Sequence, residues 1–192
     1  MSDWRERLTN RLEPLLNLPD PRRTEFCAYH DMPYAIFHYP PESEFEFRRE
    51  VSLLRTRLSQ RGKRVTVISL ATLLWEILER DAPVSELAQA EKDVGIEATI
   101  AQVHSVLSEI DPLPAVVMTK VPADADPLRD IIFITRVGAL FPVYRTSVLV
   151  EQLHGKLLIP SVLFFPGDLD GPAGLRFMGV FPPEHNYRPR IF

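Results

Sequence analysis

The sequence predicts an α/β domain with a mostly parallel sheet and helices on both faces, preceded by an N-terminal helical arm. The clearest sign is the segment 130–165, where two apolar runs, Ile131–Thr135 and Ser161–Phe165, flank one amphipathic helical pattern. Apolar runs without polar alternation are typical of parallel strands buried on both faces, so this segment predicts a βαβ unit. Strand and helix patterns alternate in the same way earlier in the chain, which favours the α/β class.

The first 31 residues predict the helical arm, and residues 32–192 predict a single α/β domain. Apolar side chains recur at helical spacing in the arm, namely Trp4, Leu8, Leu12 and Leu15. Prolines follow this pattern and are expected to end the helix. Two interpretations of the arm stay open: a helix packed on the domain, which we favour, and a detachable arm that binds a partner.

The first strand and helices of the domain follow from short apolar runs and helical spacing. Tyr34–His38 predicts the first strand, and the pattern from about Ser43 predicts a helix with Ser43 as its N-cap. Lys63–Ile68 predicts the second strand. Ser69 is then placed to cap a largely buried helix, Leu70–Arg80.

The pattern is helical again over Ala82–Ile110. An apolar stripe runs along it at intervals of four and three, formed by Ile96, Ile100, Val103, Leu107 and Ile110. Leu113–Val121 fits a short helix or a strand, and we favour the helix because the turn-like ADADP then leads directly into the next strand. After Gly167 we expect a turn-rich loop. An edge strand over Leu175–Val180 and a C-terminal surface tail, EHNYRPRIF, complete the domain.

Composition limits the classes of function. The chain has 192 residues, 45% hydrophobic composition, a net charge of -4 and a pI near 5.8, which argue against broad electrostatic capture of nucleic acid or anionic membrane. Its one cysteine, Cys27, fits a reducing compartment. The N-terminus lacks an apolar signal core, and no run approaches a membrane span. We therefore expect a cytoplasmic protein without membrane partners.

The phosphate-binding motifs of nucleotide enzymes are missing from this strand–helix framework. The loop after the first strand, HYPPESEFEF, has no glycine or lysine and carries Glu42, Glu44 and Glu46, which would repel phosphate. The Gly-Lys pair in Arg61–Arg64 precedes a strand instead of opening a helix. The sequence thus predicts an NTPase-like topology without ATP or GTP binding. The histidines are scattered and no G-x-S-x-G elbow occurs, so we predict no metal, no cofactor and no catalytic residue.

One candidate site lies at the carboxyl ends of the two strands of the βαβ unit, where ligands usually bind in such sheets. Its candidate residues are Arg136, Gly138, Tyr144, Arg145, Gly167 and Asp168. Guanidinium groups beside a helix start can bind a phosphate or the carboxylate of a partner. The alternative is that Arg136 pairs with an internal acid, for example Asp168, and we leave the two interpretations level.

A second candidate cluster lies near the C-terminus, where basic residues surround an aromatic one: Arg176, Tyr187, Arg188 and Arg190. This pattern fits contact with nucleic acid through phosphate and stacking. It also fits a surface tail or a segment that docks on a protein. Because the whole chain is acidic, we favour the second interpretation.

The same segments carry a resemblance to a known family. TRVGALFPVYRTSVLVEQL is followed by PSVLFFPG, GLRFMG and HNYRPRIF, and preceded by YAIFHYPP and RREVSLLRTRLSQRGKRVTVISLATLLWEIL. In this order, over about Met32–Phe192, these blocks resemble the BrxB family of bacteriophage exclusion (BREX) defence systems.

The resemblance implies a non-catalytic assembly or adaptor component of a phage-defence complex. Its implied partners are other BREX proteins, first the alkaline-phosphatase-like PglZ protein, in a system that also has ATPase and methyltransferase components. Two alternatives remain: a module that binds nucleic acid weakly through the C-terminal arginines, and a degenerate nucleotide-processing factor with a site at the strand ends.

Overall fold

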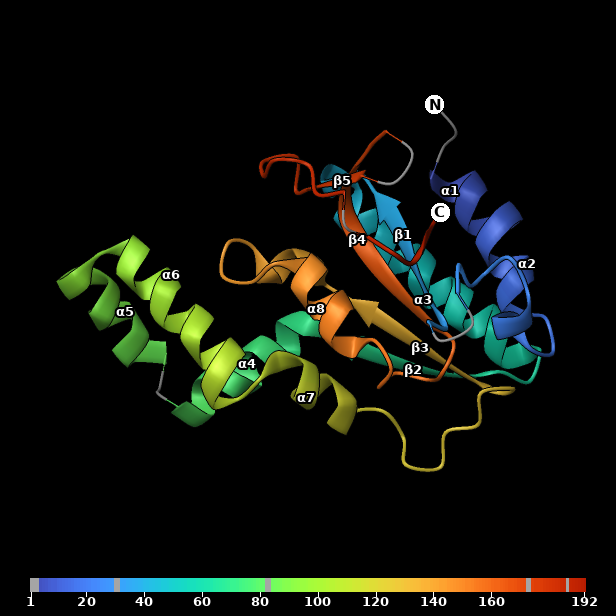
Figure 1. The fold of residues 1–192 in the computed structure, drawn as a ribbon, viewed down its shortest axis with the longest axis horizontal. Helices are drawn as coiled ribbons and strands as arrows, with labels where there is room; N and C mark the ends of the chain where they lie inside the picture. Colours follow the sequence, from blue (N-terminus) through green and yellow to red (C-terminus); the bar gives the residue numbers. More distant parts are fainter. Residues whose placement is uncertain (1–3, 30–31, 82–83, 172–173, 186) are drawn as a thin grey trace.

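Five strands form one hydrogen-bonded path in the order β2-β3-β4-β1-β6, and β5 pairs with the end of β4 (Figure 1). The pairs along the path are parallel, and only β4–β5 is antiparallel. This computed structural model describes residues 4–29, 32–81, 84–171, 174–185 and 187–192. The strands are β1 (Tyr34–Tyr39), β2 (Arg64–Ser69), β3 (Asp130–Thr135), β4 (Ser161–Asp170), β5 (Gly174–Phe177) and β6 (Arg190–Ile191).

The sheet separates two hydrophobic cores, which explains the uninterrupted apolar runs in the middle of β3 and in the first half of β4. Successive side chains of a strand point to opposite faces. One core receives Phe37, Phe133 and Phe164, and the other receives Ile36, Ile132 and Leu163. The predicted α/β class with a mostly parallel sheet is therefore confirmed, and so is the βαβ unit, because β3 and β4 are parallel neighbours.

Helices cover both faces of the sheet (Figure 1). One face carries α1 (Trp4–Arg7), a π turn (Leu8–Leu12), α2 (Glu13–Leu16) and α3 (Glu44–Gln60), whose buried side chains share a core. The other face carries α4 (Leu70–Asp81), α7 (Leu113–Thr119) and α8 (Thr146–Leu153). The helical interpretation of 113–121 is thus confirmed.

The capping predictions had different outcomes. Ser69 caps α4, since its Oγ accepts a 3.3 Å hydrogen bond from the Thr72 N–H. Ser43 was expected to cap α3 but makes no side-chain cap bond, because it belongs to a 3₁₀ turn (Pro41–Ser43) that leads into the helix.

The N-terminal helix is packed on the domain. Its apolar face is buried, with Trp4, Leu8, Leu12 and Leu16 each 5% exposed or less. The buried carboxylate of Glu13 accepts hydrogen bonds of 2.8–3.1 Å from the guanidinium of Arg57 on α3. Both contacts favour the packed helix over the detachable arm.

The helical hairpin of α5 (Val84–Val94) and α6 (Ile96–Ser105) projects away from the sheet (Figure 1). The predicted stripe along α6 is only partly buried, because Ile96 and Ile110 at its ends are exposed. A π turn over Val106–Ile110 follows α6, and its wider winding buries Val106, which lies outside the predicted stripe, beside Leu107 of the stripe.

The end of the chain is built into the sheet, contrary to the expected surface tail. β6 adds to β1 in parallel, the Phe192 N–H donates to the Ile36 carbonyl at 2.9 Å, and Tyr187 and Phe192 are buried. The expected loop after Gly167 is also wrong in part, since β4 continues to Asp170 to pair with β5.

Candidate functional site

Arg136 follows directly on β3 in a left-handed backbone conformation, with φ of 60° and ψ of 34°. This conformation costs a residue with a Cβ about 1 kcal/mol or more. Its side chain is 40% exposed, and Nε lies 3.8 Å from Oε1 of Glu44 at the start of α3. The acid beside Arg136 is thus Glu44, and Asp168 does not take that place.

Gly138 and Gly167 lie where neighbouring segments pack directly on the backbone. A Cβ on Gly138, in the 3₁₀ turn Val137–Leu140, would lie 3.3 Å from Sδ of Met178. A Cβ on Gly167 would lie 2.2 Å from the carbonyl oxygen of Arg176, so β5 can approach β4 here only because this residue is glycine. These glycines give the edge its close packing.

Asp168 and Arg176 face each other across the β4–β5 hairpin, and both are exposed. The Nη2 atom of Arg176 lies 3.9 Å from Oδ1 of Asp170, and Nε2 of His185 lies 3.5 Å from Oδ2 of the same carboxylate. The hairpin therefore presents a surface of mixed charge.

Two polar side chains at the end of β1 were not among the predicted site residues. Nδ1 of His38 lies 3.3 Å from the carbonyl oxygen of Gly167, and burial, reinforced by the charge of Arg7, lowers the pKa of His38 to about 4. The Tyr39 hydroxyl donates to the Glu44 carboxylate, and burial raises the pKa of Tyr39. Their position at a strand end was the only sequence signal for them.

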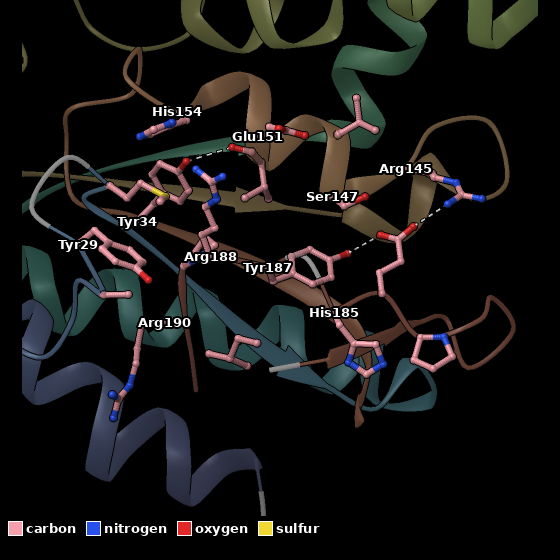
Figure 2. Close-up of a pocket in the computed structure, with 18 residues that line it drawn as sticks. Tyr29, Tyr34, Arg145, Ser147, Glu151, His154, His185, Tyr187, Arg188 and Arg190 are labelled. Carbon is pink, nitrogen blue, oxygen red and sulfur yellow. Dashed lines mark hydrogen bonds and ion pairs between the residues drawn. The ribbon is translucent and has the colours of Figure 1, made fainter. Parts of the chain in front are cut away.

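Glu184 connects the two predicted clusters. Its Oε1 accepts a 3.0 Å hydrogen bond from Nη1 of Arg145, and its Oε2 lies 3.4 Å from the Tyr187 hydroxyl (Figure 2). Burial raises the pKa of Tyr187, which keeps the phenol neutral beside the acid. Tyr144, the neighbour of Arg145, has its ring in the core beneath α8, so it supports the site from within.

Arg145, Tyr187, Arg188 and Arg190 line one open groove of about 1340 Å³, which we call the C-terminal groove. It lies between α8, the segment before β1 and the C-terminal residues (Figure 2). Its charged lining consists of those arginines with Glu151 and Glu184, and Tyr29, 57% exposed, lies at its other end. Arg176, Arg136, Gly138, Gly167 and Asp168 do not line it.

Arg188 is the member of this groove with the greatest freedom to bind. Its exposed side chain extends toward α8 (Figure 2), and among the described residues it makes no hydrogen bond or ion pair. In contrast, Arg145 is held by Glu184, and Nη2 of Arg190 lies 4.0 Å from Oε2 of Glu25. Such an arginine can bind a carboxylate or phosphate through two parallel hydrogen bonds.

Metal-binding groups, an activated thiol and membrane-spanning helices are all missing from the described part of the chain. No group of three histidine, cysteine, aspartate or glutamate residues there is arranged to hold a metal ion. Burial raises the pKa of Cys27 to about 11, so its thiol is not activated. None of the described helices is long and apolar enough to span a membrane.

The fold and the groove define a class of protein: an α/β domain with a mostly parallel sheet and an open, arginine-lined groove beside one edge strand. Within this class the family is clear. The family model described as "BREX protein BrxB" matches residues 66–191, and the chain belongs to this family. A curated relative, "BREX protein BrxB" of Bacillus cereus (strain H3081.97), is 27% identical over 157 residues, which cover 81% of this chain and 80% of the relative.

Family membership makes the chain a component of a BREX phage-defence system and confirms the resemblance seen in the sequence. Other proteins of such a system are accordingly its partners. No solved structure gives a significant match to the chain.

Proposed function

We propose that the chain is a non-catalytic adaptor that binds another protein of its BREX system through the C-terminal groove, with the alkaline-phosphatase-like PglZ protein as the first candidate partner. The observation that carries this proposal is the convergence of Arg145, Tyr187 and Arg188 on one groove, from two clusters separated by about 40 residues of sequence.

The groove has the residue types of a protein-binding site. Arginine and tyrosine contribute most strongly to the binding energy of protein interfaces. Glu184 already orders Arg145 and Tyr187, so these side chains lose little conformational freedom when a partner binds. Arg188, without a partner among the described residues, supplies the charge that an acidic segment would neutralise.

The arginines of the groove also support a second candidate, a nucleic-acid-binding module. Phosphate contacts by Arg188 and Arg190 with stacking on Tyr29 would suit a single strand. Glu151 and Glu184 in the lining and the net charge of -4 oppose this candidate, because they repel phosphate. The adaptor function is therefore the better supported.

Pairwise co-expression tests the proposal. The affinity-tagged chain is expressed with each other protein of the system, PglZ first, and complexes are isolated at moderate salt after nuclease treatment. We expect at least one stable complex, and we expect Arg188→Glu to weaken it while Arg129→Glu does not. Arg129 is an exposed arginine outside the groove, so both variants change the net charge equally.

Two results would count against the adaptor. Absence of any complex would remove the proposed function. Loss of every complex on nuclease treatment, with direct binding of nucleic acid by the isolated chain, would support the nucleic-acid-binding module instead.

A further inference from the structure

β2 is the edge strand opposite β6, and one side of its backbone faces outward. The Arg64 N–H donates to the Arg129 carbonyl at 2.8 Å, so Arg64 bonds toward β3. Because residues of a strand alternate in the side to which their N–H and C=O point, those of Val65 and Val67 point away from β3. Neither makes a backbone hydrogen bond across that edge among the described residues.

Beside this open edge lies a second groove, of about 790 Å³, which we call the β2 groove. It runs along α3, whose residues from Glu44 to Gln60 contribute one wall. The sheet contributes the other side, with Val67 and Ser69 of β2 next to residues of β3, β4 and β1. Its apolar lining includes Val51, Val67 and Phe164, and Val67 is 40% exposed although it lies in a strand. The groove thus offers apolar surface next to free backbone groups.

The rim of the β2 groove carries more positive than negative charge. Its charged residues are Arg48, Arg55, Arg136 and Glu44. Glu44 is shared, since its Oε1 accepts a 2.8 Å hydrogen bond from Arg48 and also lies 3.8 Å from Nε of Arg136. Arg55 is exposed and makes no ion pair with any described residue. One acid thus serves three arginines, and an acidic side chain of a partner would pair with Arg55.

We propose that β2 binds an extended acidic segment of a partner protein as an added strand, with alternate side chains of that segment in the β2 groove. An extended segment pairs its backbone with an open edge and places every second side chain on one face. The six residues of β2 span about 20 Å, which is enough for such pairing. The proposal rests on the proposed adaptor function and gives it a second docking surface.

A second copy of the chain fits this edge less well. Two β2 strands related by a two-fold axis run antiparallel, and each copy would bring a positively charged groove to the joint. Neither copy would supply an acidic segment, and like charges repel. An acidic partner segment would instead be attracted by Arg55 and Arg136.

The two grooves lie on opposite sides of the molecule. The C-terminal groove is beside β6 on the α8 face, whereas the β2 groove is beside β2 on the α3 face. One partner can therefore occupy each groove without a clash, and this arrangement would let the chain bridge two proteins.

The test is run with every system protein that binds in the pairwise experiment, and at least one of them should depend on β2. Val67→Pro removes an outward N–H but no bond to β3. Arg55→Glu cancels the net positive charge of the rim. We expect each to weaken binding at least about tenfold. The control Arg49→Glu makes the same charge change on α3 outside the groove and should alter binding less than about twofold. Melting curves confirm that the variants are folded.

Amide hydrogen exchange supplies the second readout. In the free chain, the amides of Val65 and Val67 should exchange quickly and those of Thr66 and Ile68 slowly. Binding of the partner should slow exchange at Val65 and Val67. Short overlapping peptides that tile the partner should then identify an acidic segment that gives the same protection.

The outcomes separate this inference from the proposed function. If complexes form but in every one of them Val65 and Val67 stay unprotected and neither variant weakens binding, the added strand is wrong and the adaptor stands. If protection instead appears in the chain alone as its concentration rises, β2 pairs with a second copy and the inference is overturned. If no system protein binds, the proposed function fails and this inference falls with it.

Discussion

The guanidinium of Arg136 at the end of β3 faces the carboxylate of Glu44 at the start of α3, with 3.8 Å between Nε and Oε1. The pair joins two elements at the carboxyl edge of the sheet, yet Arg136 is 40% exposed, and exposed ion pairs at this distance contribute less than about 1 kcal/mol. Its left-handed backbone costs more than the pair returns. The side chain is thus better explained by binding than by stability.

Replacing Arg136 with glycine separates these roles. Glycine adopts φ of 60° without steric cost, so Arg136→Gly should leave the free energy of unfolding unchanged within about 1 kcal/mol, or raise it slightly. The same variant should weaken partner binding, as should Arg136→Ala. Thermal melts paired with pull-downs check this. A large drop in melting temperature with binding retained would assign Arg136 to the fold.

Glu13 should anchor the N-terminal helix. Glu13→Ala removes the buried acceptor of Arg57, and the unpaired guanidinium is only about a third exposed, so we expect a loss of about 2–3 kcal/mol. Glu6→Ala, on the exposed side of the same helix, should cost less than about 0.5 kcal/mol. Urea unfolding measures both. Equal, small effects would favour an N-terminal arm that detaches.

The sequence predicted most elements of this fold because their signals are local. β3, α8 and β4 follow from two apolar runs and one helical period. Ser69 caps α4 as its position suggested. The C-terminal residues were different, because β6 exists only by pairing with β1, about 150 residues earlier, and a two-residue strand has no period to detect.

The site was predictable only in part, because it too depends on contacts between residues that are distant in the sequence. The residue types of Arg145, Tyr187 and Arg188 indicated binding, but they were assigned to separate clusters. The fold brings these side chains into one groove, where Glu184 contacts Arg145, 39 residues away in sequence. The β2 groove depends likewise on α3 leaving Val67 uncovered, which no local pattern reveals.

Gly167 and Gly138 offer a matched test of packing at the strand ends. Gly167→Ala would place Cβ 2.2 Å from a backbone oxygen, so the β4–β5 hairpin must shift, at a cost of about 3 kcal/mol or more. Gly138→Ala meets only the side chains of Met178 and Pro166 at 3.3–3.4 Å, and should cost about 1 kcal/mol or less. Urea unfolding of both variants measures the difference. Similar stabilities would contradict this packing.

Binding of nucleic acid by the C-terminal groove should be weak and sensitive to salt. Three arginines can release about three counterions, so the slope of log K against log salt should not exceed about 3 in magnitude. Gel shifts should therefore fade between low and physiological salt. Affinity that survives physiological salt, and that Arg188→Ala with Arg190→Ala abolishes, would favour the nucleic-acid-binding module.

His38 should make stability depend on pH in a defined window. Its pKa in the folded chain is lowered from 6.5 to about 4, first by burial and then by the charge of Arg7, while Asp168 and the Gly167 carbonyl act in the opposite direction. The unfolded chain therefore binds more protons between these values. Stability from the neutral ring is complete above about pH 6.5 and is lost as the pH falls toward 4.

The size of this effect is set by the shift and by the partial exposure of the ring. The shift alone corresponds to about 3 kcal/mol, and residual solvent screening reduces the expected loss to about 2 kcal/mol. His38→Asn has no titrating ring, so its stability should change less than that of the native chain between pH 7 and 4.5. Urea unfolding at several pH values measures the difference between the two proteins. Parallel curves would show that His38 is not held neutral in the fold.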